Sequence, residues 1–170
     1  MPVHSFPAVA TPDAWVLVLG TMPGKVSLRE QQYYAHPRNL FWKLSGQLLG
    51  FDAAAPYHVR VGELMSRGVA LWDVIQTCTR DSSLDSDIDA STVVANDLAG
   101  FFARQPLLRR VCFNGAKAAS LFARHVRPRL GQADSMGYLS LPSTSPANAS
   151  IPWEEKLRAW SVIHRGAAER

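Results

Sequence analysis

The chain has 170 residues, of which 47% are hydrophobic and 19% charged. This length suits one domain, expected over residues 1–170, and the composition excludes an intrinsically disordered chain. The longest apolar run, residues 14–19, is too short to cross a bilayer, and no secretory signal is visible. Two cysteines, Cys78 and Cys112, are too few for a disulfide framework, a cysteine zinc site or an iron–sulfur cluster. We therefore expect a cytoplasmic protein without membrane attachment, associated with the nucleoid if it is prokaryotic.

The net charge of +4 permits a polyanionic partner without requiring one. Residues 104–130 contain seven Lys or Arg and no acid, whereas residues 81–103 contain five Asp and no base. Each block can be an ordinary solvated face. The alternative for the basic block is a phosphate-facing surface, because basic patches bind nucleic acid by releasing its counterions.

The first half of the chain predicts two strands and two helices. Residues 15–19 are apolar and β-rich, which predicts a buried strand ending at a glycine, and the polar residues 21–38 predict a long loop. Apolar residues at helical spacing predict helices over residues 40–48 and 59–67, each with a glycine close behind. A second strand is predicted over residues 69–75.

The second half continues the alternation. A helix is predicted over residues 93–104, a strand over 107–113, and a helix from the following Asn-Gly pair through Val126. Residues 137–141 predict a fourth strand. The last helix is predicted to start at Pro152, with two glutamates in its first turn, and to end before Gly166.

Strands that alternate with helices predict an α/β fold with a parallel sheet and helices on both faces. In such sheets ligands bind beyond the carboxyl ends of the strands. This rule places Gly20–Pro23, Asn114–Gly115 and Pro142–Asn148 along one rim, where we expect the functional site.

The segment Gly20–Val26 superficially suggests a phosphate-binding loop. The nucleotide-binding pattern needs four residues between its glycines and a Ser or Thr after the lysine, whereas here there are three, and Val26 follows Lys25. Pro23 also removes a backbone N–H that would contact phosphate. A P-loop NTPase is therefore not expected.

Several separated motifs, in the right order, resemble those of the uracil-DNA glycosylase superfamily. They are GTMPG at residues 20–24, YYAHPRNLFWK at 33–43, LWDV at 71–74, FNG at 113–115 and PSTSPAN at 142–148. The combination is most similar to the hypoxanthine (deoxyinosine) DNA glycosylase branch. The resemblance runs from about Trp15 to Trp160, which is nearly the whole chain.

The resemblance implies a monofunctional DNA repair glycosylase that flips a deaminated base, hypoxanthine first, out of DNA and hydrolyses its N-glycosidic bond. It also implies a three-layer α/β/α sandwich around a four-stranded parallel sheet. Neither a metal nor an organic cofactor is expected. The expected partner is DNA containing deaminated bases, bound by a monomer without an obligate protein partner. The alternatives are a uracil-DNA glycosylase of the same superfamily and a catalytically silent lesion-binding module.

Three positions depart from the superfamily's pattern. Met22 occupies the place where efficient uracil enzymes carry Asp and mismatch-specific relatives carry Asn. Ser143 replaces a common His, and Ala147 replaces a common Leu wedge. Met22 is flexible and apolar and is suited to lining a wider slot, so it is a candidate base-binding residue.

The resemblance implies that Asn39 is the catalytic group. Its side-chain carbonyl can orient a water by accepting a proton from it, and positioning can suffice for an oxocarbenium-like transition state. The alternative is helix capping alone, because Asn39 directly precedes the helix predicted over residues 40–48.

Asn114 is the candidate for reading the base. A side-chain amide can donate to a ring carbonyl and accept from the adjacent ring N–H, the edge that hypoxanthine and uracil share. The alternative is a turn residue in the left-handed conformation. Tyr33, Tyr34 and Phe41 are candidates to stack on the base, although the helical spacing of Phe41 is also typical of a core residue.

The candidate DNA-binding residues come mainly from the segment before the last helix. Hydroxyls and N–H groups there can hold phosphates while the base is flipped, although an ordinary turn is the alternative. The candidates are Ser143, Thr144, Ser145, Ala147 and Asn148, together with Arg38, which with His36 supplies cationic groups from the first loop. Asp73, at a strand end, is interpreted as a structural hydrogen-bond acceptor, with a role as a base as the alternative.

Overall fold

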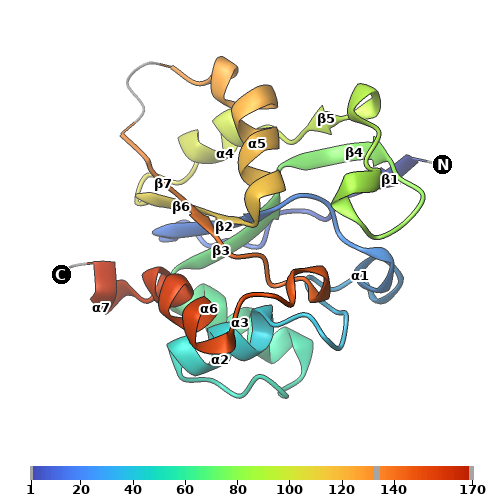
Figure 1. Ribbon diagram of the computed structural model, residues 1–170. Coiled ribbons are helices and arrows are strands. Elements are labelled where there is room, and N and C mark those ends of the chain that lie inside the picture. The colour runs from blue at the N-terminus through green and yellow to red at the C-terminus, as the bar shows by residue number, and fades with distance from the viewer. Residues whose placement is uncertain (1, 132–134, 169–170) are drawn as a thin grey trace.

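The computed structural model describes residues 2–131 and 135–168, and its centre is a four-stranded parallel sheet (Figure 1). The strand order is β3-β2-β6-β7, and every neighbouring pair is parallel. The strands are β2 (Val16–Gly20), β3 (Val69–Asp73), β6 (Arg110–Asn114) and β7 (Gly137–Leu141). The predicted parallel sheet is therefore confirmed.

Helices cover both faces of this sheet (Figure 1). One face carries α4 (Leu98–Ala103) and α5 (Ala116–His125), and the other carries α2 (Phe41–Leu49), α3 (Tyr57–Ser66) and α6 (Trp153–Trp160). The side chains of β2 alternate between the two apolar clusters, as a strand buried on both faces requires. The three-layer α/β/α arrangement is thus as predicted.

Shorter elements connect these layers. They are the helices α1 (Lys25–Glu30) and α7 (Arg165–Ala168) and the 3-10 turns η1 (Asp85–Asp87), η2 (Ala90–Thr92), η3 (Arg127–Arg129), η4 (Pro146–Asn148) and η5 (Ser161–Ile163). In the parts of the chain that the structure describes, no helix has the length and apolar character needed to span a membrane.

A second, antiparallel sheet was not predicted. It consists of β1 (Pro2–His4), β4 (Ile75–Thr79) and β5 (Val94–Ala95), in the order β1-β4-β5. The single strand predicted over residues 69–75 is wrong, because the chain leaves the parallel sheet at Val74. The Val74 N–H donates to the Gly20 carbonyl (2.9 Å) and thereby ties the start of β4 to the rim of the central sheet.

Other predicted boundaries also need correction. The loop predicted over residues 21–38 contains α1. The helix predicted from residue 93 begins only at Leu98, because the Asp97 carboxylate caps it by accepting from the Gly100 N–H (2.9 Å). The third strand begins at Arg110 rather than at residue 107. The last predicted helix ends at Trp160, and Gly166 lies within α7 rather than after a helix.

Candidate active site

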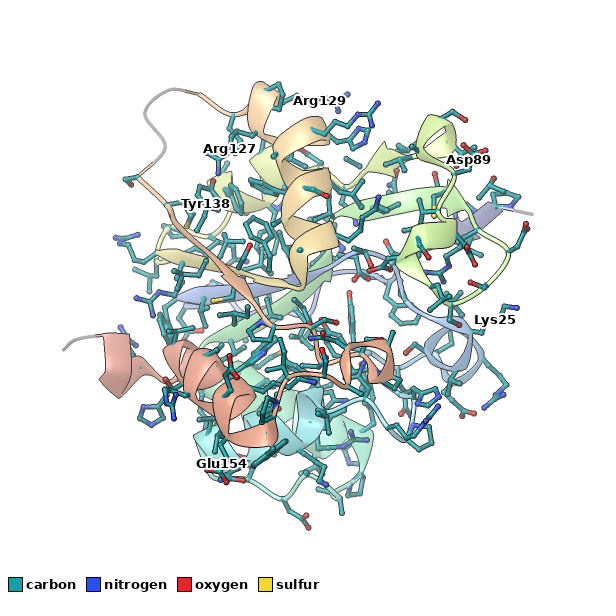
Figure 2. All side chains as sticks on the ribbon, viewed as in Figure 1. Lys25, Asp89, Arg127, Arg129, Tyr138 and Glu154 are labelled. Carbon is teal, nitrogen blue, oxygen red and sulfur yellow. The ribbon has the colours of Figure 1, made fainter. Side chains whose placement is uncertain are left out.

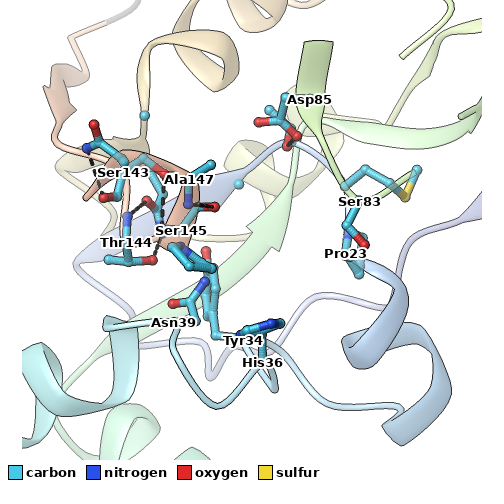
Figure 3. Close-up of a pocket in the computed structure, with 18 of the residues that line it drawn as sticks. Pro23, Tyr34, His36, Asn39, Ser83, Asp85, Ser143, Thr144, Ser145 and Ala147 are labelled. Atoms are coloured by element: carbon cyan, nitrogen blue, oxygen red, sulfur yellow. Dashed lines mark hydrogen bonds between the residues drawn. The ribbon is translucent and has the colours of Figure 1, made fainter. Parts of the chain in front are cut away.

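A pocket of about 1050 Å³ opens at the carboxyl ends of the parallel strands. The three rim segments predicted from the sequence, residues 20–23, 114–115 and 142–148, all contribute to its lining. Figure 3 shows Tyr34, His36 and Asn39 on one side, Ser143–Ala147 on a second side, Pro23 and Ser83 on a third, and Asp85 across from Asn39. The topology therefore brings segments far apart in the sequence into one concave site.

The turn after β2 is held by a buried arginine. The Arg80 guanidinium, from a side chain that is 6% exposed, donates to the Pro23 carbonyl (2.5 Å) and to the Met22 carbonyl (3.5 Å). Met22 lines the pocket but is itself only 6% exposed and packs into the core cluster under α5. Nothing in the sequence distinguished Arg80 from the other arginines, so its role in shaping this wall was missed.

Tyr34 is held in an uncommon backbone conformation. Its φ of +56° lies in the left-handed region, which is costly for a large side chain and is concentrated at functional sites. Its ring packs on Phe41 with centroids 4.3 Å apart. Phe41 is 0% exposed and does not line the pocket, so the structure gives it a supporting position beneath Tyr34 rather than contact with a base.

Tyr33 contributes to the pocket lining but is only 3% exposed and packs into the apolar core. Its hydroxyl donates to the Pro7 carbonyl (3.0 Å), and its own carbonyl accepts from the Trp42 indole (2.9 Å). Of the aromatic residues proposed for stacking, only Tyr34 therefore has a ring free of such anchors at the pocket.

Asn39 lies at the start of α2 and lines the pocket. The N-cap position is held by Leu40, one residue later than the capping alternative predicted, but the Asn39 Oδ1 accepts from the Phe41 N–H (3.0 Å) and so still satisfies one free N–H of the first turn. A carbonyl oxygen has two lone pairs, and this bond uses only one of them. Capping and orientation of a water are therefore compatible at this residue.

The Asn114 amide is engaged at both ends by Thr144. Its Nδ2 donates to Thr144 Oγ1 (2.9 Å), and its Oδ1 accepts from the Thr144 N–H (2.9 Å). Thr144 is 0% exposed, and its carbonyl accepts from the Leu40 N–H (3.0 Å). These bonds join β6, the segment after β7 and the start of α2. Thr144 is therefore buried and cannot contact phosphates. The hydrogen bonds of the Asn114 side chain hold the pocket rim in place.

The rest of the segment 142–148, here called the rim loop, is held by its own side chains. Ser143 Oγ accepts from the Ser145 N–H (3.1 Å), and Ser145 Oγ accepts from the Ala147 N–H (3.2 Å). Both hydroxyl protons remain available to donate to a phosphate. The carbonyl of Asn148 accepts from the ammonium of Lys156, a side chain only 2% exposed (2.6 Å). Ala147 is exposed.

Two carboxylates line the pocket, Asp73, which the sequence analysis singled out, and Asp85, which it did not. Asp73 is 4% exposed, and its Oδ2 has no hydrogen-bond partner, so the prediction of a structural acceptor is wrong. Burial, and then the nearby charge of Asp85, raise the pKa of Asp73 to about 7, against a smaller lowering by Arg80. Asp85 Oδ1 accepts from the Thr21 hydroxyl (2.7 Å), and burial raises the pKa of Asp85 as well.

The basic side chains that line the pocket come from residues 25–38, and of the basic block Lys117 is close enough to act on the charge of Asp85. Lys25, His36 and Arg38 line the pocket, and Lys25 and Arg38 are exposed. The η3 arginines, Arg127 and Arg129, follow the far end of α5, a helix of 10 residues whose first residue lines the pocket (Figure 2). Ten residues span about 15 Å, so the basic block does not form one phosphate-facing surface.

Within the described ranges there is no group of three or more His, Cys, Asp or Glu side chains that could hold a metal ion. The pocket instead offers an aromatic ring, amides, hydroxyls and two carboxylates around a space that suits a nucleoside. An α/β/α domain with such a pocket at the carboxyl rim of its parallel sheet has the organisation of a ligand-binding or catalytic site.

Comparison with known proteins gives the family. The family model of the uracil DNA glycosylase superfamily matches residues 6–163, so the chain belongs to this superfamily. It is 35% identical over 165 residues to a hypoxanthine DNA glycosylase of Methanosarcina acetivorans, covering 95% of this chain and 98% of the relative. It is also 35% identical over 123 residues to a hypoxanthine DNA glycosylase of Methanosarcina barkeri, covering 69% and 74%.

The fold comparison agrees. A solution NMR structure of a candidate uracil DNA glycosylase from Methanosarcina acetivorans superposes with a TM-score of 0.81 at 32% sequence identity. The match covers 97% of this chain and 98% of that one. The resemblance inferred from the motifs is thereby confirmed.

Proposed function

We propose that this chain is a DNA glycosylase that removes hypoxanthine from deoxyinosine in DNA and leaves an abasic site. The observation that carries the proposal is the pocket at the sheet rim of a superfamily member that shares 35% identity with a hypoxanthine DNA glycosylase over 95% of its length. Uracil shares the reading edge of hypoxanthine, so uracil excision is the alternative activity.

The reaction follows from the residues around the pocket. A flipped nucleotide places its base in the pocket beside Tyr34 while the rim loop and Arg38 hold the flanking phosphates. Asn39 orients a water toward C1′ through its free lone pair. The C1′–N9 bond breaks with its electron pair going to the purine, the water oxygen bonds to C1′, and its proton leaves to the base or to solvent. Positioning and electrostatics supply the rate.

Selection of purine over pyrimidine is assigned to the width of the pocket. Met22 offers no hydrogen bond to a water, unlike the carboxylate of efficient uracil enzymes, and Ala147 offers little side chain to wedge a stable pair open. We therefore expect lesions in weakened pairs to be processed best. The protein is further proposed to act as a monomer without an obligate protein partner.

The test is base release from two matched oligonucleotides, one with deoxyinosine and one with deoxyuridine, under single-turnover conditions. Faster release of hypoxanthine supports the proposal. Faster release of uracil would favour the alternative activity, and binding of the lesion without release of either base would favour the silent lesion-binding module. Met22→Asn is expected to shift the ratio of the two rates toward uracil.

A further inference from the structure

The floor of the pocket contains two buried oxygens that nothing in the described chain satisfies. Asp73 Oδ2 and the Tyr34 hydroxyl both lack a partner with normal hydrogen-bond geometry, although the hydroxyl lies near the Asn114 amide. Leaving a buried polar group unpaired is costly, so native structures rarely do so without a reason. Both residues line the pocket, so a bound ligand can supply the missing partners.

The two groups converge on one place. A methyl group added to Gly20 would lie 2.6 Å from Asp73 Oδ1 and 3.3 Å from the Tyr34 hydroxyl. Glycine at the end of β2 therefore allows a carboxyl and a phenol from different segments to approach the same point. The carboxyl comes from the end of β3, and the phenol comes from Tyr34, in the segment between α1 and α2.

We propose that Asp73 and Tyr34 together read the edge of the flipped base, with the Asp73 carboxylate accepting from N1–H and the Tyr34 hydroxyl donating to O6. This inference rests on the proposed function and names the residues that give it specificity. It transfers base reading away from Asn114, whose amide is held at both ends by Thr144.

The pair distinguishes a deaminated base from its parent. Hypoxanthine presents an N–H donor beside a carbonyl acceptor, which matches an acceptor beside a donor. Adenine presents the reverse, with an unprotonated N1 and an exocyclic N–H₂. The N1 lone pair would then face the carboxylate, and the groups in the pocket would stay unpaired, which a buried site penalises strongly.

The protonation state of Tyr34 favours its role as a donor. Burial and the nearby Asp73 raise the pKa of the Tyr34 hydroxyl far above neutrality, so it remains a donor. The charged groups facing Asp73 are Asp85 from η1 and Arg80 from the end of β4, and Tyr33 and Tyr34 face it from the first loop. Burial and then the Asp85 charge disfavour the carboxylate and raise the pKa of Asp73 to about 7, and an N–H donor from the base opposes this by stabilising the charged form.

The experiment compares two DNA substrates, one with deoxyinosine and one with deoxynebularine, whose purine lacks both N1–H and O6. The variants are Asp73→Val, which has a similar size and suits a strand, and Tyr34→Phe, which keeps the ring on Phe41. In both variants the ratio of inosine to nebularine excision is expected to fall by about tenfold or more. Asp73→Val is also expected to keep or raise the melting temperature, because it removes a buried, unpartnered carboxyl.

The matched control is Tyr57→Phe. It removes a hydroxyl that accepts from the Tyr33 N–H (3.0 Å) outside the pocket, so it should lower stability without changing the ratio. Unchanged ratios in folded Asp73→Val and Tyr34→Phe, with wild-type inosine excision intact, would overturn this inference and leave the proposed function standing. Failure of the wild type to excise inosine would instead overturn the proposed function, and the base-edge assignment with it.

Discussion

Replacing Asn39 separates its two roles. Asn39→Ala removes the oxygen that accepts from the Phe41 N–H, and it also removes the carbonyl proposed to orient water. Loss of a capping side chain costs about 1 kcal/mol. For a chain of this length that lowers the melting temperature by roughly 2–4 °C.

This loss of stability is too small to explain a loss of activity. A domain with about 5 kcal/mol of stability that loses about 1 kcal/mol remains more than 99% folded at 25 °C. Misplacement of the attacking water, by contrast, is expected to reduce the excision rate by about 100-fold or more. The two roles therefore differ by orders of magnitude in their effect on turnover.

The assay is single-turnover release of hypoxanthine, measured beside thermal unfolding. Asp97→Ala is the matched control, because it removes a comparable cap from α4 through the bond to the Gly100 N–H, and Asp97 does not line the pocket. It should lose similar stability and keep the wild-type rate. Asn39→Asp should keep the cap. A folded Asn39→Ala protein with a near-normal rate would refute the catalytic assignment and leave capping alone.

Two further predictions concern charge. Neutralising Lys25 and Arg38 at the pocket should reduce the slope of log affinity for DNA against log salt by about 2. Neutralising the η3 arginines should leave this slope unchanged. A change of slope with the η3 pair alone would place the DNA phosphates at η3 instead of at the pocket. Because the folded state raises the pKa of Asp73 from 3.8 to about 7, it binds more protons than the unfolded state between these pH values, and this contribution to stability is lost as pH rises through that window. Asp73→Asn should therefore gain stability over the wild type more at pH 8 than at pH 4. The rate of inosine excision should rise with pH, with a midpoint of about 7 that reports the pKa of Asp73. Asp85→Asn should lower this midpoint, because the Asp85 charge raises the pKa of Asp73. Equal midpoints in the wild type and in Asp85→Asn would show that Asp85 does not affect the titration of Asp73.

The sequence predicted the central sheet because each of its strands carries a local signal. The run at Val16–Gly20 is apolar on both faces, and residues 137–141 stand alone between polar segments, so both strands were placed correctly. The antiparallel sheet could not be predicted in this way. Its strand β5 has only two residues, and β4 continues directly from β3 without a turn signal. Long-range pairing, not local preference, decides where that run divides.

The site was predictable to the extent that it depends on topology. The three rim segments follow the carboxyl ends of parallel strands, and that rule was enough to bring them together. The hydrogen-bond partners of the side chains could not be predicted from this rule. Asn114 could bond to Thr144 or to a base, and Asp73 could be satisfied or unsatisfied, with the same local sequence. Asp85 was counted within an acidic block, and only the fold shows it in the pocket.

The unfavourable features of the chain gather around this pocket. Tyr34 has a left-handed backbone and an unpartnered hydroxyl, Asp73 has an unpartnered carboxyl oxygen, and the Arg80 side chain that holds the pocket wall has an unpartnered Nε. Each costs free energy in the unbound protein, and an apolar side chain at position 73 would avoid part of that cost. Under the proposed base-edge assignment, a ligand that offers a donor beside an acceptor pairs the Asp73 and Tyr34 oxygens, and one with the reverse order leaves them unpaired. The cost of these two unpaired oxygens is then recovered only with a deaminated base.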